Sequence, residues 1–230
     1  MKLCIVFDCY QTLVYKKNQE KIVQDFSNSV LKKNIPISYL KRAYSIIYER
    51  RKFKHPSFTI LQDRKNFYIS YNKELFAILG ISISSNQALQ LNENFNGAKW
   101  AVYPDVVSTL IKLKRRKISM GLLSNWTANF QEVIKKLNLR EYFNFIYASH
   151  DLKIQKPDPK FFTYSLKDIL KKHQTIYYVG NDYELDILPA RKAGLKTILI
   201  DRHNKYPVLA DCIRIVKLTD LIKKLEYEIL

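Results

Sequence analysis

Short runs of apolar residues recur at the start of the chain and through its second half, and each run is followed closely by a polar residue. Residues 3–7 contain no charged or hydroxyl side chain and lead directly to Asp8. A run of this length that is rich in β-branched and aromatic side chains is typical of a strand buried on both faces. We predict four further strands, at residues 118–123, 145–148, 176–179 and 197–200.

Patterns of helical spacing lie between these runs. In residues 104–117, Val106, Leu110 and Leu113 fall on one stripe, and Pro104 suits the first turn of a helix. The same character is found in residues 127–137, 158–171 and 183–193. Strands that alternate with helices predict right-handed βαβ units, and therefore an α/β fold with a doubly wound, mostly parallel, Rossmann-like sheet.

The segment from residue 16 to residue 99 has no such buried runs. Its apolar positions recur at helical spacing over residues 21–33, 38–52, 62–79 and 86–95. We therefore predict an all-helical cap domain at 16–99, inserted into a discontinuous α/β core formed by 1–15 and 100–230. A cap beside the strand ends would exclude water from a pocket there and select its substrate.

The composition is that of a compact protein that needs no covalent staple. Of 230 residues, 47% are hydrophobic and 26% are charged, which excludes low-complexity and disordered classes. The three cysteines have no CxxC spacing, so we expect a reducing, cytoplasmic environment. The first apolar run is too short for a signal peptide, and no run approaches the length of a membrane span. We therefore expect no membrane association.

The chain is strongly basic, with 39 Lys and Arg against 21 Asp and Glu and a formal net charge of +18. This charge suits an anionic partner, and we expect a small anionic substrate. The basic residues are dispersed along the chain and do not form one long stripe, so we expect no nucleic-acid partner. The oligomeric state does not follow from the sequence.

Candidate catalytic residues follow the predicted strands. Asp8 comes directly after the first strand and could act as a nucleophile that forms a covalent intermediate, while Ser124 follows the second and could donate to an oxyanion. Lys156 precedes Pro157, which disfavours helix at the lysine and places its ammonium in a loop. Because ligands bind beyond the carboxyl ends of the strands in such sheets, we expect these side chains to share one pocket.

Two acids follow the predicted strand at 176–179. Asp182 lies just past the end of that strand, and Asp186 comes four residues later. Residues with this separation can share one face of a helix, so we expect both carboxylates to reach the same pocket.

These segments, in this order, resemble the haloacid dehalogenase-like (HAD) hydrolase superfamily, and in particular its subfamily I, which has a helical cap. The resemblance covers nearly the whole chain. It rests on four segments, at residues 8–13, 122–125, 155–159 and 179–186. The long separation between the first two segments leaves room for the inserted cap.

The resemblance implies a hydrolase with a covalent aspartyl intermediate on Asp8. By the same resemblance Thr12 orients the loop, Ser124 binds the transferred group and Lys156 steadies the charge of the intermediate. It further implies Mg²⁺ as cofactor, which would be held by the groups that follow: Asp8, the Tyr10 carbonyl, and Asp182 or Asp186.

Tyr10 departs from the phosphatases of the superfamily, which carry a second Asp at this position as general acid and base. A Tyr here is similar to the L-2-haloacid dehalogenases, which need no metal. Asn125 and Asn181 also resemble the substrate-binding asparagines of the dehalogenase pocket. Arg42 is our candidate for the cap arginine that binds a substrate carboxylate.

Other positions depart from one or both groups. Phe162 stands where the dehalogenases have a Tyr, and Gln11 replaces a Gly that is usual in both groups. Phosphatases place a metal-binding acid directly after the glycine of the fourth segment, where this chain has Asn181 followed by Asp182. An inward Asp182 would complete the Mg²⁺ site, whereas an outward Asp182 would leave Asn181 as an uncharged substitute.

Three hypotheses follow from these residues. The first is a Mg²⁺-dependent phosphatase of a small phosphorylated metabolite, favoured by the two acids and the basic charge, in which Tyr10 or a cap residue assists proton transfer. The second is a metal-independent L-2-haloacid dehalogenase, favoured by Tyr10, Asn125 and Asn181. The third is a catalytically degenerate member of the superfamily with a binding role.

Overall fold

The computed structural model describes the chain except residues 1–2, 54–60, 96–98, 208–210 and 230. Two compact units can be distinguished by their internal contacts. The first comprises Met1–Tyr15 and Ala101–Leu230, and the second comprises Lys16–Trp100. Each unit is described separately below.

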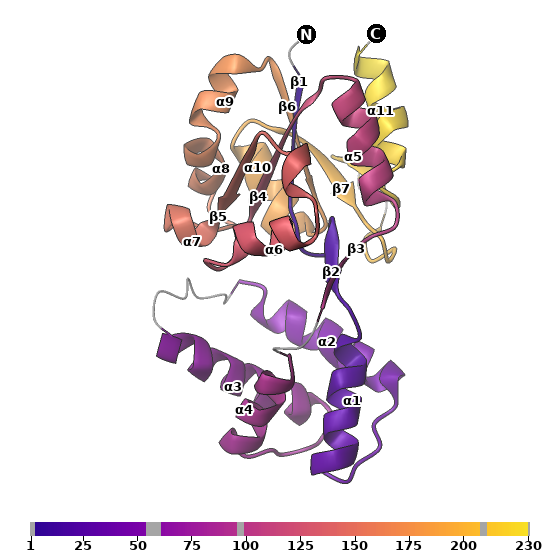
Figure 1. Ribbon diagram of the computed structural model, residues 1–230, viewed down its shortest axis with the longest axis vertical. Coiled ribbons are helices and arrows are strands. Elements are labelled where there is room, and N and C mark those ends of the chain that lie inside the picture. Colours follow the sequence, from indigo (N-terminus) through magenta and orange to yellow (C-terminus); the bar gives the residue numbers. More distant parts are fainter. Residues whose placement is uncertain (1–2, 54–60, 96–98, 208–210, 230) are drawn as a thin grey trace. The chain divides into compact units, whose positions relative to one another are not determined.

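The described residues of the first unit form a six-stranded sheet (Figure 1). In sheet order the strands are β5 (Phe145–Ala148), β4 (Ser119–Ser124), β1 (Leu3–Phe7), β6 (Thr175–Gly180), β7 (Lys196–Ile200) and β8 (Ile213–Ile215). Neighbouring strands are parallel throughout. The predicted α/β fold is therefore confirmed, and so are its five predicted strands. The sixth strand, β8, was not predicted because it is only three residues long and contains Arg214.

Helices cover both faces of this sheet (Figure 1). One face packs on α8 (Lys160–Ser165), α9 (Lys167–Lys172) and α10 (Leu188–Lys192), with Val6 and Tyr178 among the buried strand residues. On the other side lie α5 (Val106–Arg115) and α11 (Asp220–Ile229). The remaining short elements are α6 (Phe130–Lys136), η2 (Arg140–Tyr142) and α7 (Ser149–Leu152).

Two predicted helices of the first unit differ in detail. The helix predicted at 158–171 is divided into α8 and α9 at Leu166, whose backbone leaves the helical region. The helix predicted at 183–193 begins with a π-helical turn, η3 (Tyr183–Ile187), before α10. This turn adds a residue to the first helical turn after β6 and changes the direction in which the following side chains point.

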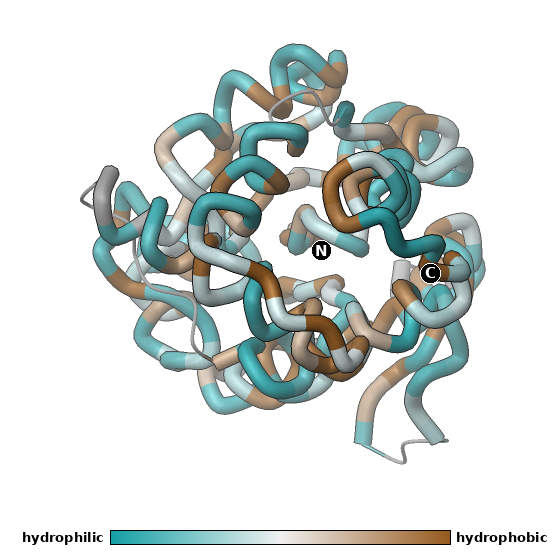
Figure 2. The backbone as a smooth tube through the Cα atoms, turned by 90° about the horizontal axis from the view of Figure 1, so that it is seen from below, coloured by the Kyte–Doolittle hydropathy of each residue, from teal (hydrophilic) through white to brown (hydrophobic). Residues whose placement is uncertain are grey.

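The second unit contains four described helices, which are α1 (Gln19–Val30), α2 (Ile37–Arg51), α3 (Leu61–Ile78) and α4 (Ser85–Asn94). Its buried core includes Phe26, Leu40, Ile47, Phe76 and Leu91. Hydrophobic and hydrophilic segments alternate along the backbone, as expected of helices with one buried face (Figure 2). No helix in the described parts of the chain is long and apolar enough to cross a membrane.

A two-stranded ribbon, which was not predicted, lies where the chain passes between the units. It consists of β2 (Val14–Lys16) and β3 (Trp100–Val102). The backbone N–H of Lys17 donates to the Lys99 carbonyl at 2.9 Å, and that of Tyr103 donates to the Leu13 carbonyl at 3.0 Å. Strands of three residues carry too short an alternation to be recognised in the sequence.

Candidate active site

The candidate active site lies where the order of the strands reverses. β1 is flanked by β4 on one side and by β6 on the other, and the chain continues outward from both neighbours. Asp8 follows β1 directly, and its backbone N–H donates to the Val179 carbonyl of β6 at 2.8 Å. Such a reversal opens a crevice at the carboxyl ends of the central strands, which is the usual ligand site of this architecture.

The two carboxylate oxygens of Asp8 have different surroundings. Oδ1 accepts hydrogen bonds from Ser124 Oγ at 2.8 Å and from Lys156 Nζ at 2.6 Å. Oδ2 has a longer contact with Thr12 Oγ1, at 3.3 Å, and shares the single proton of this hydroxyl with Asn181 Oδ1. The structure thus brings together Asp8 and Thr12 of the first segment, Ser124 of the second and Lys156 of the third, and it leaves Oδ2 as the less constrained oxygen.

Lys156 is buried, and its ammonium has three polar neighbours. Besides Asp8, Nζ donates to Asp186 Oδ1 at 2.5 Å and to the Tyr178 hydroxyl at 3.2 Å. An ammonium has three N–H donors, so each donor has an acceptor. Burial alone would lower the pKa of Lys156, but the carboxylates of Asp186 and Asp8 raise it well above its usual value. The ammonium therefore stays protonated.

Asn125 binds the backbone of Lys156. Its Nδ2 donates to the Lys156 carbonyl at 3.0 Å, and its Oδ1 accepts from the Lys156 N–H at 2.8 Å. The sequence suggested that Asn125 contacts substrate. In the structure both polar atoms of its side chain bind the lysine backbone, so Asn125 positions Lys156, and its contact with substrate stays a prediction.

Asp186 reaches Lys156 because Gly180 has no side chain. A Cβ at residue 180 would lie 2.5 Å from Cβ, Cγ and Oδ2 of Asp186, which is closer than such atoms can approach. Asp186 Oδ2 also accepts from the backbone N–H of Asp182 at 2.9 Å. Burial raises the pKa of Asp186 to about 6, although the Lys156 ammonium opposes the rise.

Asp182 is buried but does not share a helix face with Asp186. It precedes η3 with an extended backbone, and its Oδ1 accepts from the N–H groups of Glu184 at 2.9 Å and Leu185 at 2.8 Å. Asp182 therefore caps the helix, contrary to the expectation that both carboxylates point into the pocket. Asn181 lies beside the nucleophile loop instead, where its Oδ1 accepts from Thr12 Oγ1 at 3.1 Å.

The predicted Mg²⁺ site combined Asp8 and the Tyr10 carbonyl with Asp182 or Asp186, and both of these acids have other partners in the structure. Asp186 is bound by Lys156 and Asp182 caps η3. Within the described residues no cluster of three or more His, Cys, Asp or Glu side chains could hold a metal ion. The Asp8 carboxylate and Asn181 Oδ1, which both adjoin the Thr12 hydroxyl, supply hard oxygen donors. Since Mg²⁺ is often held by one carboxylate together with waters and substrate phosphate, this smaller set fits it.

Tyr10 and Gln11 form the turn after the nucleophile. The N–H of Gln11 donates to the Val14 carbonyl at 2.7 Å, and Gln11 adopts a φ of 62°. This left-handed conformation explains why glycine would be favourable at this position. Tyr10 is half-buried. Burial raises the pKa of Tyr103, and the nearby Arg202 guanidinium lowers it.

Arg42 belongs to the second unit. It is an exposed residue of α2. Its predicted role in binding a substrate carboxylate remains a prediction.

Two residues with clear roles in the site were not singled out from the sequence. Tyr178 contacts Lys156, but within an apolar run a tyrosine resembles any other core residue. Arg202 donates to the Thr12 carbonyl at 2.8 Å and to Asp105 Oδ2 at 2.9 Å, and its guanidinium lies 4.0 Å from the centre of the Tyr103 ring. The only feature of the sequence that pointed to Arg202 was its position directly after Asp201, an acid that follows the predicted strand at 197–200.

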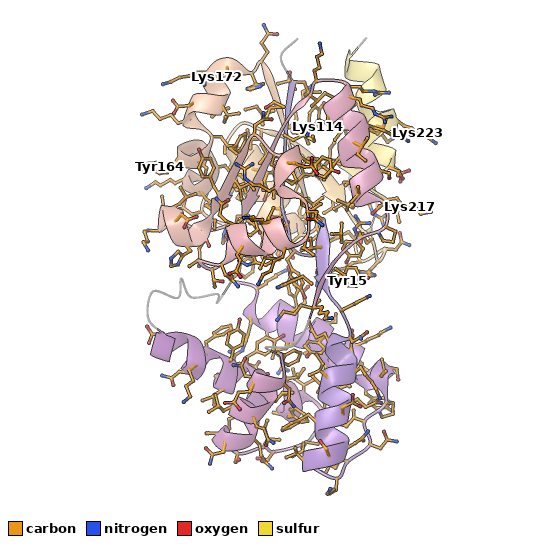
Figure 3. The ribbon with its side chains drawn as sticks, viewed as in Figure 1. Tyr15, Lys114, Tyr164, Lys172, Lys217 and Lys223 are labelled. Carbon is orange, nitrogen blue, oxygen red and sulfur yellow. The ribbon has the colours of Figure 1, made fainter. Side chains whose placement is uncertain are left out.

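Basic side chains lie on separate parts of the first unit. Lys114 is on α5, Lys172 ends α9, and Lys217 and Lys223 lie before and within α11 (Figure 3). Their separation agrees with the dispersed charge of the sequence.

Comparison with known proteins supports the resemblance. Residues 5–200 match the family model described as haloacid dehalogenase-like hydrolase. An uncharacterized Saccharomyces cerevisiae protein, YMR130W, is 33% identical over 144 residues, which are 56% of this chain and 47% of that protein. A glyceraldehyde 3-phosphate phosphatase from Methanopyrus kandleri is 31% identical over 105 residues, or 45% of each protein. The chain thus matches about half the length of both relatives.

A solved structure shows the same fold over both units. The HAD-hydrolase YfnB from Bacillus subtilis, whose crystal structure contains magnesium, has a TM-score of 0.73 and 18% identity. The match covers 98% of this chain and 99% of YfnB. At this identity the likeness concerns the fold. The family model covers most of the sequence and includes all four segments that form the site. On this evidence the chain belongs to the haloacid dehalogenase-like hydrolase family.

Proposed function

We propose that this hydrolase cleaves a small phosphate monoester through a covalent intermediate on Asp8. The observation that carries the proposal is the asymmetry of the Asp8 carboxylate, whose Oδ1 is held by Ser124 and Lys156 while Oδ2 has, among the described residues, only the longer contact with Thr12. A carboxylate held by one oxygen presents the other as a nucleophile in a defined direction. The relative from Methanopyrus kandleri, which is named as a phosphatase, supports a phosphate ester as substrate.

In the first step Asp8 Oδ2 attacks phosphorus, and the bond between phosphorus and the ester oxygen breaks. The bonding electron pair leaves with that oxygen, which takes up a proton. In the second step a water oxygen attacks phosphorus of the aspartyl phosphate and loses a proton, the bond between phosphorus and Oδ2 breaks, the Asp8 carboxylate is regenerated and inorganic phosphate is released. One water molecule is consumed, and the proton taken up in the first step is balanced by the proton released in the second.

Lys156 and Ser124 hold the nucleophile during both steps. Their hydrogen bonds to Oδ1 fix the carboxylate plane and offset the negative charge near phosphorus. Asp186 holds the ammonium from its other side and Asn125 holds the lysine backbone. Lys156 therefore acts in a position determined by several independent contacts.

Charge balance favours a bound cation for this reaction. Asp8 and Asp186 place two carboxylates against the single ammonium of Lys156, and a phosphate ester adds further negative charge. Mg²⁺ held by Asp8 and Asn181 would supply positive charge to the phosphoryl oxygens. Because Asn181 is neutral, we expect weaker Mg²⁺ binding than a second carboxylate would give.

Tyr10 stands where an acid would donate a proton to the leaving group. A phenol has an ordinary pKa of about 10 and is a weaker acid than a carboxyl group at neutral pH. We therefore expect slow turnover of esters with poor leaving groups and faster turnover of esters whose leaving group needs no protonation.

The test is Mg²⁺-dependent phosphate release from a panel of sugar phosphates, nucleotides and a chromogenic ester. Asp8→Asn should abolish release, whereas Asp168→Asn, which removes an exposed carboxylate on α9, should leave it unchanged. Chelation of the metal should reduce release to background. Absence of phosphate release from the whole panel would contradict the proposal.

A second candidate, hydrolysis of a 2-haloacid, is favoured by Asn181, which places a neutral amide beside Thr12. Here Asp8 would attack carbon and displace halide, and water would then hydrolyse the ester. Chloride release from 2-chloropropionate that persists in EDTA and is lost in Asp8→Asn would identify this activity.

A further inference from the structure

Tyr178 places a hydroxyl group inside the buried polar cluster beneath Asp8. The side chain is fully buried on β6, and its hydroxyl donates to the Leu123 carbonyl of β4 at 2.9 Å. The same oxygen accepts from Lys156 Nζ at 3.2 Å. Asp186 Oδ1 lies 3.5 Å away. The hydroxyl therefore connects the lysine to the strand that carries Ser124.

The hydrogen atoms in this cluster are all accounted for. A phenol has one proton, and the Leu123 carbonyl can only accept, so the lone pairs of the Tyr178 oxygen face Lys156. The three ammonium protons then go to Asp8, Asp186 and Tyr178. Without the Tyr178 hydroxyl, one buried N–H of Lys156 would lose its acceptor, and the Leu123 carbonyl would lose the donor of this hydrogen bond.

The ring of Tyr178 is fixed as firmly as its hydroxyl. Phe162 packs edge-on against it, with ring centres 4.9 Å apart, and both side chains are fully buried. On the strand, Tyr178 is in register with Val6 of β1 and Thr197 of β7. A hydroxyl on such a ring has little freedom to follow a moving ammonium, so it defines a position for it.

We propose that Tyr178 is a positioning residue, which holds the Lys156 ammonium on Asp8 Oδ1. The carboxylates of Asp8 and Asp186 both attract the Lys156 ammonium. Because they pull in competing directions, they do not by themselves fix the position of the ammonium between them. The Tyr178 hydroxyl supplies the third contact, which is anchored to the sheet. This inference rests on the proposed role of Asp8 as nucleophile. It assigns to Tyr178 the placement of the Lys156 ammonium beside that nucleophile.

Tyr177 offers a matched control on the same strand. It is the preceding residue and is also buried, but successive side chains on a strand point to opposite faces of the sheet. Tyr178→Phe and Tyr177→Phe each remove one buried hydroxyl while keeping the ring. We expect Tyr178→Phe to lower kcat about tenfold with KM changed by less than about twofold, and Tyr177→Phe to leave both unchanged. Equal effects of the two variants would overturn the proposal.

A second readout does not need activity. The ζ-ammonium of a buried lysine can be observed by amine-selective ¹H–¹⁵N NMR, and Lys156→Arg identifies the signal by its loss. Tyr178→Phe should shift or broaden this signal, whereas Tyr177→Phe should not. If no substrate is turned over but the signal responds, the proposed function fails and the contact stands. An unchanged signal in Tyr178→Phe overturns the inference, and so does a changed signal with unchanged kcat.

The native protein provides the test if Tyr178→Phe does not fold. A nuclear Overhauser contact between the Lys156 ζ protons and the Tyr178 ring is expected, because Nζ lies 3.2 Å from the hydroxyl oxygen. Its absence in a spectrum that resolves the Lys156 signal would contradict the proposed placement.

Discussion

Asp186 is almost completely buried beside Lys156, and burial raises its pKa from 3.8 to about 6. A carboxyl group whose pKa is higher in the folded than in the unfolded state binds its proton more tightly when the protein is folded. Its contribution to stability is therefore fully present below pH 3.8 and is lost as the pH rises through 6. This direction is opposite to that of most paired carboxylates.

We predict that the unfolding free energy of the wild type, relative to Asp186→Asn, rises as the pH falls from 7 to 4. The rise should be at most about 3 kcal/mol, which corresponds to a pKa shift of roughly two units. Urea denaturation at a series of pH values measures it. Asp201→Asn is the control, because backbone N–H groups of Tyr206 and Lys205 and the Arg214 side chain outweigh burial and lower the pKa of Asp201. Its pH dependence should have the opposite sign, and the same sign in both would contradict the prediction.

At the scale of elements, the junction between β6 and η3 decides which acid enters the site. Gly180 allows Asp186 to approach the strand, and the capping contacts of Asp182 start the π-helical turn. The pattern of apolar residues predicts the strand and the helix that follows it. The turn between them depends on individual backbone torsions, for which the sequence carries no periodic signal.

We predict that Gly180→Ala displaces Asp186 and lowers kcat/KM about a hundredfold, since displacements of about 1 Å near the reacting groups can have effects of this size. Gly121→Ala on β4 is a matched control, because its Cβ would meet the Phe145 ring instead of a polar side chain. It should lower thermal stability without changing the kcat/KM of the folded fraction. Equal losses of kcat/KM in both variants would indicate a general packing defect.

At the scale of the whole molecule, Arg202 joins segments that are far apart in the sequence. It binds the Thr12 carbonyl and Asp105, and Asp105 also accepts from the backbone N–H of Leu218 at 2.6 Å. Tyr103 packs on the same guanidinium. These contacts lie within the first unit and fix the loop that carries Thr12.

We predict that Arg202→Lys lowers the unfolding free energy by about 1–3 kcal/mol, because lysine cannot reproduce the planar set of donors. It should also lower kcat, since Thr12 would be less firmly held. Arg191→Lys, at an exposed ion pair with Asp211, is the control and should change the unfolding free energy by less than about 1 kcal/mol. Urea denaturation of both variants tests the difference, and similar losses would contradict a special role of Arg202.

The sequence by itself determined the α/β fold, its five longer strands and the meeting of Asp8, Ser124 and Lys156. The physical reason is that buried strands require uninterrupted apolar runs, and parallel strands bring their carboxyl ends to one edge. These properties depend on residue type and spacing alone.

Only the tertiary structure decided that Asn181 adjoins Thr12 while Asp182 caps η3, that Asn125 binds the Lys156 backbone, and that Tyr178 completes the contacts of the ammonium. Each of these outcomes depends on the direction of a polar side chain at a turn or on a partner that is distant in the sequence. Hydrophobic periodicity specifies which face of an element is buried, but it does not specify which hydrogen bonds the polar groups form there.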